Sequence, residues 1–277
     1  MLTQANDFRD ECDALYAVLD AAPVAAWTKV TQFKDWTFDD VIGHLHMFDV
    51  AASIALDGRE ALAAFFVQLM TGRAAGQTLT QFTRHWLGGC QGRDLLQRWR
   101  DYYGVLAGRY LQLDPSLRVA WAGPDMSTRS LISARQMEAW AHGQAVFDAL
   151  GLERDERDRI RNIAIMGVNT FGWTFVNHRR EVPPVKPHVR LTSPSGEVWE
   201  WNDPNESERI DGTAVDFCRV VTQTRNVADT GLRATGETAR TWMSLAQCFA
   251  GPPESPPAPG ARFVQPCPDW AGRMTGE

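Results

Sequence analysis

The sequence predicts α followed by α+β architecture: an up-and-down four-helix bundle and then a smaller α+β domain. Apolar residues recur at three- and four-residue spacing from Thr3 to about Asn177, as they do in amphipathic helices. The proline-rich joint Glu181–Pro187 cannot continue a helix. Beyond it, residues 189–201 alternate between apolar and polar, as half-buried strands do. We therefore expect the bundle at residues 1–180, the α+β domain at 185–250 and a proline-rich tail at 251–277.

Most helices of the bundle have a start or stop signal. Pro23 ends the first helix, and Thr37 caps the second, with Asp39 and Asp40 in its first turn, where carboxylates meet unpaired backbone N–H groups. Gly151 is the expected C-cap of a later helix. Short connections between such helices favour antiparallel neighbours. After the first helix, we expect helices near residues 38–56, 60–70, 93–113, 130–150 and 154–176.

The second domain is expected to begin with a β-hairpin. Val189–Thr192 and Val198–Trp201 alternate on either side of the turn sequence Ser193–Glu197. Two helices follow, near Thr213–Thr222 and Thr238–Phe249. The tail is rich in proline and is expected to be extended or disordered, although three of its residues could dock on the protein. They are Phe263, Cys267 and Trp270.

The composition excludes several classes of function. No apolar run of the 277 residues approaches the about 18–20 that cross a membrane, and a net charge of −6 lacks the basic surplus of nucleic-acid binders. The N-terminus has neither a basic stretch nor an apolar core of a signal peptide, so we expect a cytoplasmic protein. The five cysteines form no Cys-x-x-Cys pair and are expected to be reduced. They are Cys12, Cys90, Cys218, Cys248 and Cys267.

Three residues are candidate metal ligands. Glu138 and His142 stand four apart in one predicted helix, so they lie on one face and together suit a divalent cation. His44, beside the apolar stripe of the second helix, points inward. A hydrogen-bonded helical pair and a core histidine are the structural alternatives. Three protein ligands would leave a coordination position open, as in catalytic rather than structural zinc sites.

The same residues carry a resemblance to a known family. The string Asp35–Leu45, which contains His44, and the pattern Arg135-x-x-Glu138-x-Trp140-x-His142 resemble the DinB-like metal-binding superfamily. Within it, the chain is most similar to the branch of mycothiol-dependent maleylpyruvate isomerase, and closer still to a group described only as actinobacterial-type metal-binding proteins. The resemblance implies a DinB-like four-helix bundle that holds a divalent metal, usually zinc, through His44, Glu138 and His142.

The resemblance extends to the second domain and has one departure. It implies a C-terminal domain related to sterol-carrier folds, matched by Asp211–Cys218 and Thr222–Arg225. The isomerase branch commonly has an aspartate three residues after the second histidine ligand, where this chain has Ala145. Gln144 offers only hydrogen bonds in its place, and Asp148 is on another side of the helix. The departure places isomerase chemistry in question.

Further residues are candidates for binding or catalysis. Arg135 lies one turn before Glu138 and is expected to pair with that carboxylate or to receive an anionic substrate, with a plain surface ion pair as the structural alternative. Arg225 and Gln144 are the other catalytic candidates. Trp36 and Trp140 are candidate walls of a substrate pocket, against the alternative that tryptophans serve core packing.

The leading interpretation is a zinc-dependent enzyme that acts on a small molecule. In the family that the chain resembles, a low-molecular-weight thiol adds to the substrate and permits rotation about a double bond, so we expect isomerase or S-transferase chemistry with mycothiol or glutathione. A metal-dependent hydrolase is the first alternative. A non-catalytic metal- or ligand-binding protein is the second, and Ala145 favours it.

Overall fold

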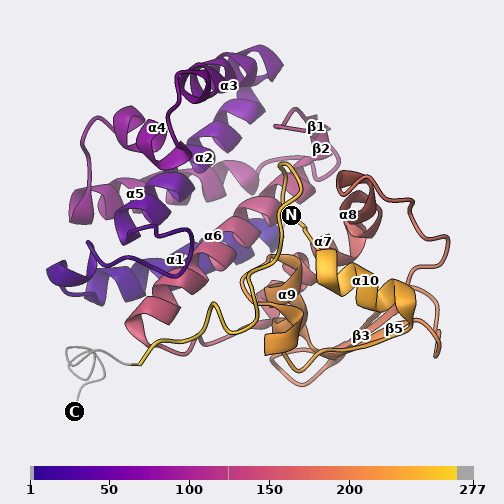
Figure 1. Cartoon of the computed structure of the whole chain (residues 1–277). Coiled ribbons are helices and arrows are strands. Elements are labelled where there is room, and N and C mark those ends of the chain that lie inside the picture. Colours follow the sequence, from indigo (N-terminus) through magenta and orange to yellow (C-terminus); the bar gives the residue numbers. More distant parts are fainter. Residues whose placement is uncertain (1–2, 124, 267–277) are drawn as a thin grey trace. The chain divides into compact units, whose positions relative to one another are not determined.

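The computed structural model describes residues 3–123 and 125–266. It divides the chain into two compact units. The first extends to Glu153 and takes in a short C-terminal segment from Val264, and the second is Arg154–Phe263 (Figure 1). Among the helices of these described residues, none is long and apolar enough to cross a membrane.

Four helices form the bundle of the first unit, as the sequence predicts. Both α1 and α2 pack against α5 and α6, and the core between them is closed by fully buried aromatic rings, among them Trp99 and Trp140. The shorter α3 and α4 pack against α2, and the two-stranded β1–β2 ribbon precedes α6. The bounds are α1 Thr3–Ala21, α2 Phe38–Asp57, α3 Arg59–Ala74, α4 Leu79–Trp86, α5 Gly92–Tyr110, β1 Arg118–Val119, β2 Met126–Ser127 and α6 Thr128–Leu150.

Local capping chemistry sets the helix ends that matter for the site. The Thr37 hydroxyl accepts from the Asp40 backbone N–H, and the Asp40 carboxylate accepts from the Thr37 backbone N–H, which is a capping box at the start of α2. Gly151 closes α6 with a left-handed φ of 70°. Both ends agree with the prediction. The short helix α4, capped by Thr78 and Gln81, was not expected from the sequence.

The second unit is an α+β arrangement, as predicted. Its sheet has the order β4-β3-β5-β6, in which β3 and β5 are parallel and the other pairs antiparallel. Helix α9 packs against β3, β5 and α7, and α10 packs against α8 and β6. The predicted hairpin is β3 with β4. The bounds are α7 Arg161–Asn169, α8 Phe171–Asn177, β3 His188–Thr192, β4 Val198–Trp201, β5 Arg209–Thr213, α9 Ala214–Val221, β6 Arg233–Thr235 and α10 Glu237–Leu245.

The helix expected at 154–176 is two helices, and both belong to the second unit. They meet at Thr170, whose hydroxyl donates to the carbonyls of Met166 and Gly167. Gly167 brings α7 close to α9, because a Cβ at this position would lie 2.8 Å from Val221. The compact units therefore divide the chain before α7, whereas the sequence analysis places the joint at residues 181–187.

The described part of the tail has neither helix nor strand, but it is hydrogen-bonded to the protein. The Gly260 N–H donates to Asp229, and Arg262 donates to the Gln223 carbonyl. Phe263 is 49% exposed and does not dock as a buried anchor. The other two docking candidates, Cys267 and Trp270, lie outside the described residues.

Candidate metal centre

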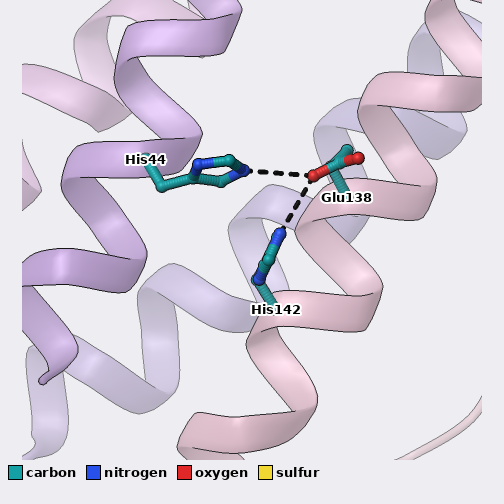
Figure 2. Close-up of side chains that lie close together, drawn as sticks. All are labelled: His44, Glu138 and His142. Carbon is teal, nitrogen blue, oxygen red and sulfur yellow. Dashed lines mark hydrogen bonds and ion pairs between the residues drawn. The ribbon is translucent and has the colours of Figure 1, made fainter. Parts of the chain in front are cut away.

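Two helices of the bundle bring the three predicted ligands together. Helix α2 presents His44 toward α6, which carries Glu138 and His142 on successive turns (Figure 2). Nε2 of His44 lies 3.2 Å from Oε2 of Glu138, and Nε2 of His142 lies 3.0 Å from the same oxygen. The candidate ligand atoms are all within 4.8 Å of one another. The side chains are 11–22% exposed, so the cluster borders the surface.

Contacts at the start of α2 fix the position of His44 along the helix bundle. Arg84 of α4 makes a two-pronged ion pair with Asp40, with both N···O distances 2.7 Å. One residue before His44, Gly43 allows α4 and the residue after it to approach closely, since a Cβ at this position would lie 3.2 Å from Cγ2 of Thr83 and 2.9 Å from Cδ1 of Leu87. These contacts and the capping box hold the first two turns of α2, and with them the His44 side chain.

The electrostatics give the cluster the charge states that a cation needs. Burial lowers the pKa of His44 to about 4, and the nearby His142 acts in the same direction. Burial would raise the pKa of Glu138, but the hydrogen bonds from His142 and His44 outweigh it and hold this pKa well below its usual range. At neutral pH the site therefore offers a neutral His44 imidazole and a carboxylate, which are ligand-competent forms.

The donor set fits a divalent cation. Two imidazole nitrogens point at one carboxylate oxygen, so a cation between them would replace the two hydrogen bonds with bonds from the same atoms. Imidazole and carboxylate are ligands that Zn²⁺ takes in proteins. Ligation through Nε2 requires the tautomer that carries its proton on Nδ1.

Arg135 does not face the candidate metal centre as a substrate-binding group, because the bundle buries it. Only 2% of the residue is exposed, its Nε donates to Asp49 at 2.9 Å, and its Nη2 donates to the Leu45 carbonyl. The expected direct pairing with Glu138 is thus replaced by a pair with Asp49. Sequence reasoning missed Asp49, although its position four residues after the buried Leu45 was the available signal.

The remaining candidates have different surroundings. Gln144 is 2% exposed and donates to Asp148, and Trp140 is fully buried in the bundle core, where it is out of reach of a substrate. Arg225 is a buried residue of the second unit and donates to the Thr224 carbonyl. Trp36 lies against the cluster, with its ring 5.4 Å from that of His142. Sequence reasoning missed its neighbour Phe33, 5.0 Å from the same ring.

Comparison with known proteins places this fold and these residues in one family. Residues 8–147, which include all three clustered residues, match the family described as mycothiol maleylpyruvate isomerase N-terminal domain. Two Mycobacterium tuberculosis proteins, uncharacterized protein Rv0036c of strain H37Rv and uncharacterized protein MT0041 of strain CDC 1551, are each 38% identical over 249 residues, which is 89% of this chain and 95% of theirs.

A solved structure has the same fold. The crystal structure of the mycothiol-dependent maleylpyruvate isomerase superposes with a TM-score of 0.52 at 14% identity, over 85% of this chain and 93% of that one, and so does that of a histidine-to-alanine mutant of the enzyme. At this identity the likeness shows the fold alone. The family match over the helix bundle leads to one conclusion: the chain belongs to the mycothiol maleylpyruvate isomerase N-terminal domain family, within the DinB-like superfamily.

Proposed function

We propose that this protein is a divalent-metal-dependent enzyme that acts on a small molecule by thiol-dependent isomerase or S-transferase chemistry. The observation that carries the proposal is the convergence of Nε2 of His44 and Nε2 of His142 on Oε2 of Glu138. These three residues would hold the metal, and Zn²⁺ suits the two imidazoles and one carboxylate. Family membership supports a low-molecular-weight thiol as the second cofactor, with mycothiol ahead of glutathione.

The roles of the protein groups follow from their surroundings. The anionic Glu138 supplies the negative charge of the site, and the neutral His44 supplies a nitrogen lone pair. When bound, a zinc ion held by these three ligands would lower the pKa of a bound water toward ~7 and would deprotonate a coordinated thiol. The Trp36 ring lies against both imidazoles and the Phe33 ring against that of His142, which gives the ligands apolar surroundings. Arg135 stays inside the bundle and supports the helices rather than the substrate.

Two alternatives remain. A metal-dependent hydrolase would use the same three ligands with water in place of thiol. A non-catalytic metal- or ligand-binding protein is favoured by Ala145, which offers no proton-transfer group. For the second alternative, the core of the second unit around Trp242 is packed with aromatic rings, since Trp242 lies 5.1 Å from Phe171 and 5.8 Å from Phe217. The convergent donor atoms of the metal centre are the observation that favours the metal-dependent proposal.

The first experiment measures metal by mass spectrometry on protein purified without a chelator or a histidine tag. We expect about one equivalent of zinc in the wild type, as for a mononuclear site. His142→Ala and Glu138→Gln should lose it and keep the wild-type helical content. His46→Ala is the matched control, because His46 is a buried histidine of the same helix α2 outside the cluster. Equal metal content in all four proteins would refute the site.

A second experiment separates the enzyme from the binding protein. The zinc-loaded protein is mixed with cis-unsaturated keto acids such as maleylpyruvate, with mycothiol, with glutathione and without thiol. Thiol-dependent isomerisation that is lost in His142→Ala supports the proposal. Thiol-independent hydrolysis of model esters, assayed in parallel, favours the hydrolase. Metal binding without turnover of either the keto acids or the esters favours the binding protein.

A further inference from the structure

Among the described residues, the two imidazoles of the candidate metal centre have no hydrogen-bond partner at Nδ1, the ring nitrogen that faces away from Glu138. Nδ1 of His44 and Nδ1 of His142 are both buried, and neither has a hydrogen-bond partner among the residues that the structure describes. In most metal sites this nitrogen donates to a carboxylate, a carbonyl or water, which fixes the orientation of the ring. Something else must orient the rings here.

Aromatic side chains surround the imidazoles instead. The Trp36 ring stacks on that of His142, with centroids 5.4 Å apart and an interplanar angle of 11°, and it lies 5.2 Å from the ring of His44. Phe33 meets His142 edge-on at 5.0 Å, and Phe48 lies 4.7 Å from His44. The rings of the two histidines are themselves 4.5 Å apart. Both imidazoles are therefore held by ring packing.

The Trp36 ring is itself firmly placed. Its backbone closes a turn in which the Thr31 N–H donates to the Trp36 carbonyl at 2.8 Å and the Trp36 N–H donates to the Phe33 carbonyl at 2.9 Å. Phe33 also packs edge-on against the Trp36 ring, with centroids 5.0 Å apart. The next residue, Thr37, is the N-cap of α2, the helix that carries His44. One short segment thus ties the stacking ring to a ligand helix.

The backbone of this turn is strained at two residues. Lys34 and Asp35, the two residues between the aromatic pair, have φ angles of 51° and 56°. This left-handed region costs a non-glycine residue about 1 kcal/mol or more, so two successive residues in it are uncommon. The strained pair places Phe33 and Trp36 on the same side of the turn, where both contact His142.

We propose that Trp36, supported by Phe33, is a positioning residue for the metal ligands. Its stacking sets the ring orientation of His142, and its contact with His44 sets that of the second imidazole, in the role that a hydrogen bond donated by Nδ1 plays elsewhere. This inference rests on the proposed function, because it concerns the same site.

The test measures zinc affinity by competition with a chromophoric chelator, together with the visible spectrum of the Co²⁺-substituted protein. Trp36→Ala should weaken zinc binding by about 10- to 100-fold, the usual effect of losing a group that orients a ligand. It should also shift the Co²⁺ bands, because the ligand geometry changes. Trp36→Phe keeps an aromatic plane and should stay near the wild type in both readouts. Trp36→Leu keeps apolar burial without a plane and should behave like Trp36→Ala.

Trp86→Ala is the matched control. The Trp86 ring lies 5.8 Å from the ring of His46, which belongs to α2, as His44 does, but is not one of the clustered residues. This variant therefore removes a tryptophan that packs on a histidine without a role in metal binding. It should leave zinc affinity and the Co²⁺ spectrum unchanged. Wild-type affinity and spectrum in both folded Trp36→Ala and folded Trp36→Leu, or an equal loss in Trp86→Ala, would overturn the inference alone. A wild-type protein that binds no zinc would overturn the proposed function and the inference with it.

Discussion

Arg135 and Asp49 form an ion pair inside the helix bundle, with 2.9 Å between Nε and Oδ1 and only 3% and 2% of their side chains exposed. Asp49 also accepts from Nε1 of Trp99 at 3.0 Å, and Arg135 also donates to the Leu45 carbonyl. The pair thereby joins α2, α5 and α6. Burial raises the pKa of Asp49 and Arg135 opposes the shift, so each charge depends on the other.

Removing either partner of this pair should destabilise the bundle strongly. Arg135→Met leaves the Asp49 carboxylate buried without its counter-ion, and we expect a loss of about 3–5 kcal/mol in the free energy of unfolding. The cycle also includes Asp49→Asn and the double variant Arg135→Met, Asp49→Asn. The double variant should be more stable than the sum of the two single effects predicts, because it leaves no unpaired charge. Urea denaturation of the four proteins measures this coupling. Arg129→Met, on the exposed face of α6, is the control and should stay within about 0.5 kcal/mol of the wild type.

Strictly additive effects in this cycle would contradict the structure. They would mean that Arg135 and Asp49 act independently of one another. A destabilised Arg129→Met would show that loss of any arginine from α6 has the same effect, whatever its burial.

The parts of the fold that were predicted correctly depend on local chemistry. The cap at Thr37 and the C-cap at Gly151 follow from hydrogen bonds and a φ angle within a few residues, and the spacing of Glu138 and His142 follows from helix geometry. Such features are readable because their causes lie within one helical turn. The approach of His44 to this pair is tertiary, and it was anticipated through the resemblance of the motifs rather than from spacing alone.

The parts that were missed depend on contacts between distant segments. Strands β5 and β6 have only five and three residues, and each is held by a partner outside its own segment: β5 pairs with β3, and β6 pairs with β5 across helix α9 in the sequence. The partner of Arg135 was misassigned for a similar reason: Glu138 is close in sequence, but Asp49 meets the guanidinium across the bundle. The packing of α7 on α9, which places α7 in the second unit, is also tertiary.

The Asp40 carboxylate should make stability depend on pH in the acid range. Burial would raise its pKa, but the hydrogen bonds from Arg84 and Thr37 lower it below 3.8 overall. A lowered carboxyl pKa contributes stability above the unfolded-state value and loses it as pH falls through the folded-state value. Asp40→Asn should therefore cost about 1–3 kcal/mol at neutral pH, through the cap and the ion pair, and less near pH 3.

Urea denaturation across this pH range measures the difference between the wild type and Asp40→Asn. Asp10→Asn serves as the control, because Asp10 is on the surface of α1, 54% exposed, and its contact with Arg9 is 3.7 Å long. Its effect should be small at every pH. A difference between the wild type and Asp40→Asn that stays constant down to pH 3 would assign the loss to the cap geometry rather than to the charge.

The cysteines should differ in reactivity according to burial. Cys12 and Cys218 are fully buried and Cys248 is 6% exposed, whereas Cys90 is partly exposed. Burial also raises the pKa of the Cys12 thiol, which keeps it protonated and unreactive. In a Cys267→Ser background, a thiol reagent should modify Cys90 in the native protein and reach the other three only on unfolding. Rapid modification in a Cys90→Ser, Cys267→Ser double variant would contradict this burial.

Gly167 should be intolerant of a side chain, although it lies within helix α7, two residues before the helix ends. An added Cβ would lie 2.8 Å from Cγ2 of Val221 and 2.9 Å from Cε1 of Phe217, and both of these residues are buried in α9. Alanine normally favours a helix over glycine by about 1 kcal/mol, but overpacking a buried contact costs about 1–3 kcal/mol. We therefore expect Gly167→Ala to lower the unfolding free energy despite its better helix propensity.

The control for this prediction is a second helical glycine of the same unit. A Cβ at Gly172 of α8 would meet only Cγ1 of Val182, at an ordinary 3.8 Å, so Gly172→Ala should be neutral or stabilising by up to about 1 kcal/mol. Adding Val221→Ala to Gly167→Ala removes the methyl group that clashes and should recover part of the loss. Thermal and urea unfolding of the variants measures both effects. If Gly167→Ala were as stable as Gly172→Ala, the close contact between α7 and α9 would be refuted.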